Sequence, residues 1–200
     1  MKQVLGAEDF ARAAAALEVP PSAVKAVCMI EAPNGGFDPN DQPRILFEGH
    51  VFSRLTGGRY DATNPTISYP KWVRTFYAKG ANADARNFGE HARLTAASGL
   101  ARSAALMSAS WGRFQLMGEN YATCGFDSLQ AFINAMYDDE SAHLDAFVEF
   151  VQHDRRGKGW DALKLAVKTG NWIPFAEFFN GPRQMENAYS SKLAVAFQNG

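Results

Sequence analysis

The sequence predicts a mainly α-helical fold, a helical bundle with a small irregular or β lobe from about residue 32 to 87. Outside that region, apolar residues recur at helical spacing. The region itself is rich in Pro, Gly, Asn, Asp and aromatic residues, with short β-prone runs such as "RILFEGHVF". The chain of 200 residues is 46% hydrophobic and 20% charged, which is typical of a globular protein, so we expect a single domain over residues 1–200.

Two helices are expected before the lobe. An Ala-rich segment from Ala7 to Glu18 has acidic residues in its first turn, where the helix dipole favours them. After two prolines, Ser22 is a plausible N-cap for a second helix that ends near Glu31. The i, i+3, i+4, i+7 stripe of this helix consists of Val24, Val27, Cys28 and Glu31. Glu31 is therefore expected on the apolar face.

Helical patterns return after the lobe, separated by turn signals. The segment "SASWGRFQLMGENY" interrupts them, and "NGP" stops the helix before the last one. The expected helices run from Phe88 to about Ala109 with a break near Gly99, from Ser128 to Gln152 with a possible break near Asp138, from Trp160 to Lys168, from Asn171 to Phe179, and from about Glu186 to Gln198.

Charge and composition exclude several classes of partner. The formal net charge is -1, so the chain lacks the broad basic surface of a nucleic-acid-binding protein. No secretory signal and no membrane span is readable, which predicts a protein made in the cytoplasm without stable membrane insertion. Cys28 and Cys124 are expected as buried free thiols. The four His residues form no metal-ligand pattern, and we expect no cofactor.

Glu31 is the first candidate for chemistry. At the C-terminal end of a helix the dipole opposes a negative charge, and burial beside apolar residues also disfavours ionisation. Both effects raise the pKa of a carboxyl, as a general acid requires. The glycines of "APNGG" would leave room for a ligand beside it. A Glu turned to solvent, or paired with Arg44, is the structural alternative.

Four segments together resemble one family. "IEAPNGGF", "ILFEGHVF", "SASWGRFQLMGENY" and "FNGP" are similar to the N-acetylmuramidase domain of phage endolysins, and the likeness covers nearly the whole chain. This domain is part of the lysozyme superfamily and is related to goose-type lysozymes and lytic transglycosylases. The resemblance implies an α+β lysozyme-like fold. It also implies that the catalytic domain fills the chain, without a separate cell-wall-binding module.

The resemblance assigns roles to several residues. Glu31 would be the general acid that protonates the glycosidic oxygen, while Ser110, Gly112 and Gln115 would shape the cleft floor. Gly112 would permit close approach of the sugar, and Ser and Gln side chains can bond its polar groups. The alternative for this segment is a helix–turn packing joint, and we expect Trp111, Phe114, Leu116 and Met117 to lie mostly in the core.

Three further residues are substrate-binding candidates. Tyr121 follows the "SWGRFQ" block and could stack on a sugar ring. Asn180 could bond the substrate or terminate a helix. Tyr189 could place its hydroxyl near Glu31, or could be a core Tyr bonded to backbone. "FFNGP" has Phe179 where transglycosylases commonly have Tyr, which weakens assignment to that group.

Glycoside hydrolysis with two carboxylates needs a partner for Glu31. The candidate is Glu48 in "LFEGH", which the resemblance places in the muramidase signature. Strand alternation would put Glu48 and His50 on one face, where both could line the cleft. The alternative is that Glu48 only pairs with Arg44 or Arg54. Weaker alternatives for the carboxylate that activates water are Asp38 and Asp41.

The resemblance implies a peptidoglycan hydrolase that cleaves the β-1,4 bond between N-acetylmuramic acid and N-acetylglucosamine for host cell lysis, and a monomer is the simplest expectation. Made in the host cytoplasm without a signal peptide, it would reach the periplasmic peptidoglycan after holin-type release. One alternative is a lytic transglycosylase that forms 1,6-anhydromuramyl ends. Another is a non-catalytic glycan-binding phage protein.

Overall fold

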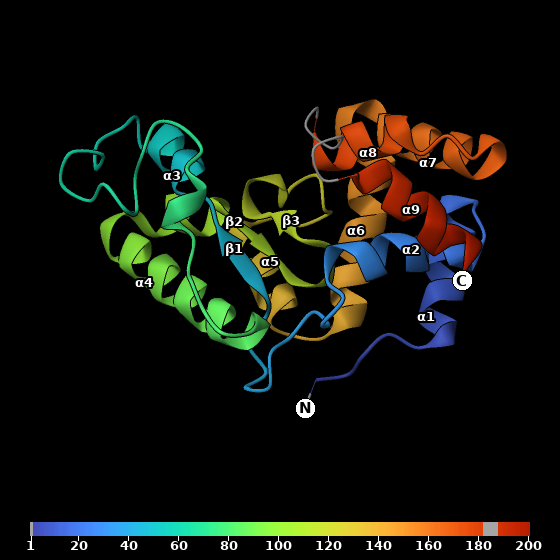
Figure 1. Ribbon diagram of the computed structural model, residues 1–200, viewed down its shortest axis with the longest axis horizontal. Helices are drawn as coiled ribbons and strands as arrows, with labels where there is room; N and C mark the ends of the chain where they lie inside the picture. Colours follow the sequence, from blue (N-terminus) through green and yellow to red (C-terminus); the bar gives the residue numbers. More distant parts are fainter. Residues whose placement is uncertain (1, 182–187) are drawn as a thin grey trace.

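The computed structural model describes residues 2–181 and 188–200 and has the mainly α-helical fold with a small β lobe that the sequence predicts (Figure 1). Helices gather at both ends of the molecule, with a short antiparallel sheet between them. The elements around the sheet are β1 (Ile45–Phe47), α3 (Gly49–Leu55), the 3-10 turn η1 (Arg74–Phe76), α4 (Ala83–Met107), β2 (Ala109–Trp111), η2 (Gly112–Phe114), β3 (Leu116–Met117) and η3 (Gly118–Asn120). The other helices are α1 (Ala7–Leu17), α2 (Pro21–Glu31), α5 (Leu129–Met136), α6 (Glu140–His153), the 3-10 turn η4 (Asp154–Arg156), α7 (Lys158–Thr169), α8 (Ile173–Asn180) and α9 (Tyr189–Gln198).

Helix α2 positions Glu31 as its last residue. The predicted N-cap is wrong: Pro20 occupies that position, Pro21 opens the helix, and Ser22 lies inside the first turn. Proline suits the first helical position because its φ is already helical and its missing N–H has no partner to lose. The apolar face of α2 packs against α9, which comes from the other end of the chain (Figure 1). The predicted start of that last helix, Glu186, lies outside the described residues.

The sheet is small and holds the segments that carry the signature residues. Its order is β1-β2-β3, with Ile45 opposite Trp111 and Leu46 opposite Ser110. The prediction that Glu48 and His50 share a strand face is wrong, because β1 ends at Phe47 and Glu48 is the N-cap of α3. A Cβ at Gly49 would lie 2.5 Å from the carbonyl oxygen of Ile67, so this turn depends on glycine.

The lobe ends earlier than predicted, because α4 already begins at Ala83. The side chain of Asn82 accepts a hydrogen bond from the Ala85 amide and so caps this helix. The break in α4 is at Ala101, where φ is -156° and ψ is 89°, two residues after the predicted position. The predicted break near Asp138 is confirmed: Ser128 caps α5 and the next helix, α6, has Asp139 as its own cap.

The core confirms several predictions for single residues. Cys28 and Cys124 are both buried and free. Trp111, Phe114 and Leu116 are buried, whereas Met117 is half-buried. Among the described residues, no helix is by itself long and apolar enough to cross a bilayer; α1 and α2 reach that limit only as a pair bent by 111°.

Candidate active site

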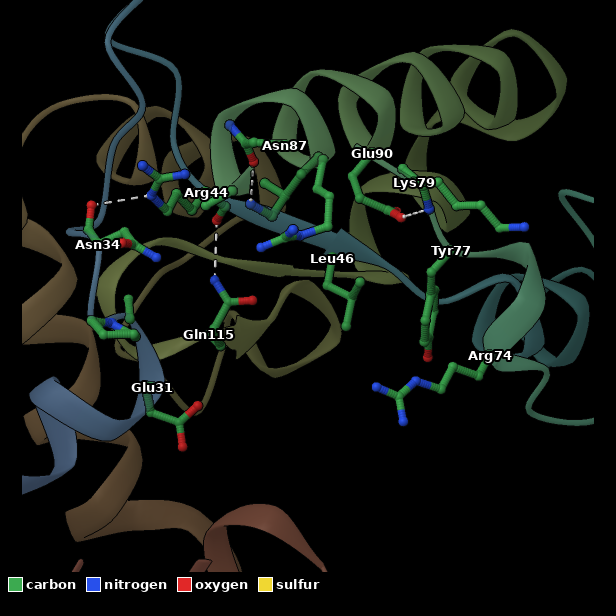
Figure 2. A pocket seen from close by; sticks show the side chains of 16 residues that line it. Glu31, Asn34, Arg44, Leu46, Arg74, Tyr77, Lys79, Asn87, Glu90 and Gln115 are labelled. Carbon is green, nitrogen blue, oxygen red and sulfur yellow. Dashed lines mark hydrogen bonds between the residues drawn. The ribbon is translucent and has the colours of Figure 1, made fainter. Parts of the chain in front are cut away.

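A pocket of about 440 Å³ opens where the C-terminal end of α2, strand β1 and the start of α4 meet (Figure 2). Its lining includes Glu31, Tyr77, Glu90 and Gln115. These four residues come from sequence positions far apart, so the fold and not local sequence creates the pocket. Its volume lies within the range typical of small-molecule sites.

Glu31 is half-buried at the end of α2 and faces this pocket. Burial raises the pKa of its carboxyl to about 7, although a hydrogen bond donated by the Tyr189 hydroxyl to Oε1 acts in the opposite direction. Pairing with Arg44, the alternative considered for Glu31, is not what the structure contains. Arg44 instead forms an ion pair with Asp84 at 2.7 Å. A carboxyl with this pKa is largely protonated below neutral pH.

Glu48 lies beside the pocket and contacts it through Tyr77. The Tyr77 hydroxyl donates a hydrogen bond to Oε2 of Glu48 at 2.6 Å and accepts one from Nε1 of Trp72 at 2.6 Å. Nδ1 of His50 lies 3.2 Å from the same Glu48 oxygen. Burial raises the pKa of Glu48, while Tyr77 and His50 oppose the rise. The alternative for Glu48, an ion pair with Arg44 or Arg54, does not form, since Arg44 pairs with Asp84 and Arg54 with Glu119.

Gln115 lines the pocket, and its amide group is already bonded inside the protein. Its Nε2 donates to the carbonyl oxygen of Gly112 at 2.8 Å. It also donates to the carbonyl oxygen of Arg44 at 3.2 Å (Figure 2). Its Oε1 accepts a hydrogen bond from the Ser110 hydroxyl at 2.9 Å. Both amide hydrogens are therefore used, and the carbonyl oxygen keeps one lone pair for a ligand. Ser110 is buried and supports Gln115 from beneath.

Gly112 has a structural reason to lack a side chain, and it is not among the residues that line the pocket. A Cβ there would lie 2.7 Å from the ring of His143, so the missing side chain makes room for this buried His. The close approach of a sugar to Gly112 stays a prediction. Nδ1 of His143 accepts a hydrogen bond from the Arg113 amide, and Nε2 donates to the carbonyl oxygen of Met136. The neutral ring thus joins the cleft segment to α6.

Other candidates lie away from the pocket. Tyr121 follows η3, packs against the core and is absent from the pocket lining. Asn180 is exposed at the end of α8, where Gly181, with φ at 80°, forms the cap. Asp38 is buried and accepts hydrogen bonds from nearby backbone amides, and with Asp41 it lines a neighbouring pocket of about 540 Å³.

The pocket also contains residues that sequence reasoning missed. Arg74, Lys79 and Arg86 line it together with Arg44, and Glu90 forms part of its wall. A local signal was present, because residues 71–93 contain five Lys or Arg and only two Asp or Glu. The near-zero charge of the whole chain hides this concentration of basic residues.

Within the described part of the chain, no group of three or more His, Cys, Asp or Glu is placed to hold a metal ion.

Comparison with known proteins identifies the family. The N-acetylmuramidase family model matches residues 20–200. The crystal structure of Burkholderia AP3 phage endolysin is similar to this chain, with a TM-score of 0.80 and 36% sequence identity, covering 98% of this chain and 71% of that chain. No curated protein is significantly similar in sequence. The chain therefore belongs to the N-acetylmuramidase family of glycoside hydrolases.

Proposed function

We propose that this protein cleaves the β-1,4 bond between N-acetylmuramic acid and N-acetylglucosamine in bacterial peptidoglycan, with Glu31 as general acid. The observation that carries the proposal is a carboxyl of raised pKa, about 7, that faces a 440 Å³ pocket. Such a group keeps its proton near neutral pH and can donate it to a departing glycosidic oxygen. Tyr189 holds the carboxyl in place through Oε1.

Glu48 serves as the second carboxylate, which steers a water molecule or steadies the oxocarbenium-like transition state. Burial raises the pKa of Glu48 too, and the neighbouring Glu90 acts in the same direction, but other neighbours oppose the rise. Tyr77 donates a hydrogen bond to Glu48, and the guanidinium of Arg93 favours its ionised form. Glu31 has only the bond from Tyr189 to offset its burial. Two carboxyls in different surroundings, one acting as the acid and one as its ionised partner, are a recurring arrangement in glycoside hydrolases.

The similarity to a phage endolysin supports a role in host cell lysis, and we propose that the protein acts there as a monomer. It is made in the host cytoplasm and reaches the periplasmic peptidoglycan after holin-type release, without stable insertion into the membrane.

Replacing Glu31 with Gln tests the mechanism. Gln keeps the size of the side chain and an oxygen that accepts the Tyr189 hydrogen bond, but it cannot donate the catalytic proton. We expect Glu31→Gln to lower the rate of reducing-end release from peptidoglycan by at least about 100-fold. Circular dichroism checks the fold. The matched control is Glu177→Gln on the exposed face of α8, which should retain wild-type activity.

Product analysis separates the competing functions. Reducing N-acetylmuramic acid ends support the proposal, whereas 1,6-anhydromuramyl ends would assign the protein to the lytic transglycosylases. Unchanged function in Glu31→Gln, with no new sugar ends from either protein, would identify a non-catalytic glycan-binding protein.

A further inference from the structure

The pocket that contains Glu31 is more basic than the chain as a whole. The formal net charge of the protein is -1, yet four Lys or Arg residues line this pocket. Arg44 is neutralised by its ion pair with Asp84. Among the described residues, Arg74, Lys79 and Arg86 form no ion pair with a carboxylate. We refer to these three residues as the basic wall.

The acids of the pocket do not cancel this charge. Glu90 is buried, and its carboxylate accepts hydrogen bonds from the amides of Phe47 at 3.0 Å and Ala78 at 2.6 Å and from Nη1 of Arg93. Its charge is therefore used by Arg93 and by the backbone. The first turns of α4 also line the pocket, and the N-terminal end of a helix adds partial positive charge.

Two residues of the basic wall, Arg74 and Lys79, face Glu31 across the pocket, and Arg86 lines it from the first turn of α4. Figure 2 shows Arg74 and Lys79 on the side of the pocket opposite Glu31, with Leu46 and Gln115 between them. All three side chains of the wall are exposed, so they can move to meet a flexible anionic ligand. Guanidinium groups bind carboxylates in a two-pronged geometry, and the Lys ammonium adds a point charge.

We propose that the basic wall, Arg74, Lys79 and Arg86, binds free carboxylates of the stem peptides attached to N-acetylmuramic acid, so that the preferred substrate is peptide-bearing glycan. This inference rests on the proposed function. N-acetylmuramic acid carries its peptide through a lactyl group, and the peptide ends in free carboxylates. Because Arg74 and Lys79 lie across the pocket from Glu31, they are placed to meet a peptide that extends across the pocket from a sugar bound beside Glu31.

Chemically matched substrates test the proposal. Soluble peptide-bearing glycan strands are compared with the same strands after conversion of their carboxylates to amides, which removes the charge and keeps the shape. We expect the wild-type protein to prefer the charged strands about tenfold in kcat/KM, mainly through KM, because exposed ion pairs contribute modestly and three act together. The preference should decrease as salt rises. In Arg74→Gln/Lys79→Gln/Arg86→Gln it should fall to about one.

The control replaces three exposed cations that do not line the pocket, in Arg59→Gln/Arg102→Gln/Lys168→Gln. It removes the same total charge and should keep the wild-type preference. Equal loss in both triple variants would mean that overall charge, and not the basic wall, attracts the substrate, and would overturn the proposal.

Two further outcomes are decisive. Strands stripped of peptide keep only the lactyl carboxylate; if the wild-type protein cleaves them as well as peptide-bearing strands, the stem peptide is not recognised and the proposal is wrong. Wild-type cleavage of charged and amidated strands at equal rates overturns it too. Release of no sugar ends from any of these strands contradicts the proposed function itself, which is a different result.

Discussion

The Tyr189 hydroxyl donates a hydrogen bond to Oε1 of Glu31, and this bond joins two residues that are 158 positions apart in the sequence. It links the last residue of α2 to the first residue of α9. Burial raises the pKa of Tyr189 well above its usual range, so its hydroxyl stays protonated and remains a donor. The packing of α2 against α9 thus sets both the position and the acidity of Glu31.

Removal of this hydroxyl should change the pH dependence of activity. The bond from Tyr189 lowers the pKa of Glu31, so its loss in Tyr189→Phe raises that pKa. The alkaline limb of the kcat/KM profile should therefore move to higher pH, because the acid keeps its proton longer. Loss of a neutral hydrogen bond that orients the acid should also cost about three- to tenfold in activity at pH 6. If the alkaline limb does not move, the Tyr189 hydroxyl does not affect the pKa of Glu31.

Glu31 should also make stability depend on pH. Its pKa is raised from 4.5 to about 7 on folding, so the folded state binds more protons than the unfolded state between these values. The stabilising contribution is complete below pH 4.5 and is lost as the pH rises through 7. At pH 8, Glu31→Gln should be more stable than wild type by on the order of 1 to 3 kcal/mol, with a smaller difference at pH 5.

Urea unfolding followed by circular dichroism at pH 8 and pH 5 measures this effect. Glu177→Gln gives the baseline for loss of one carboxylate at the surface. A stability gain of the same size at both pH values would show that Glu31 stays ionised in the folded protein.

Tyr77 should affect the acid limb of the pH profile of kcat/KM. Its bond to Glu48 lowers the pKa of that carboxyl, so Tyr77→Phe should raise it. Since the proposed role requires ionised Glu48, the acid limb of the kcat/KM profile should shift to higher pH. Tyr60→Phe is the matched control, because the Tyr60 hydroxyl donates to the carbonyl oxygen of Leu100 and lies outside the pocket lining. Equal effects of the two substitutions would count against a specific role of Tyr77.

The local sequence pattern was sufficient to predict where Glu31 lies on its helix. It was not sufficient to predict the surroundings of the second carboxylate, Glu48. Helical spacing placed Glu31 on the apolar stripe at the end of a helix, and both features depend on neighbours in sequence. The environment of Glu48 depends on Tyr77, which lies 29 residues away. The β-prone residues before Glu48 favoured a longer strand, but Gly49 and its contact with Ile67 turn the chain into α3. Such tertiary contacts leave no periodic signal.

The basic wall escaped prediction for a related reason. Its residues lie in η1, in the following loop and in the first turn of α4, so no single helix face or strand collects them. Acidic residues elsewhere in the chain cancel their charge in the net total, and only the fold brings the three cations together in one pocket. Gly112 is a different case. The sequence shows a glycine at this position, but only the structure shows that His143 occupies the space of the missing side chain.

The contact between Gly112 and His143 leads to a last prediction, which concerns stability. Ala at position 112 would adopt φ near +70° and place its Cβ 2.7 Å from a buried ring that stacks on Phe37. Gly170→Ala is the matched control, because Gly170 has φ at +75° with open space around it and therefore reports backbone strain alone. We expect Gly112→Ala to lower the free energy of unfolding by roughly 1 to 3 kcal/mol more than Gly170→Ala does, since overpacking a core costs about that much. Urea unfolding of both variants measures the difference. Equal losses in the free energy of unfolding would mean that backbone strain alone explains why position 112 is a glycine, and that the His143 ring moves aside freely. A larger loss in Gly112→Ala, accompanied by lower activity, would establish that the ring fixes the backbone from which Gln115 reaches the pocket.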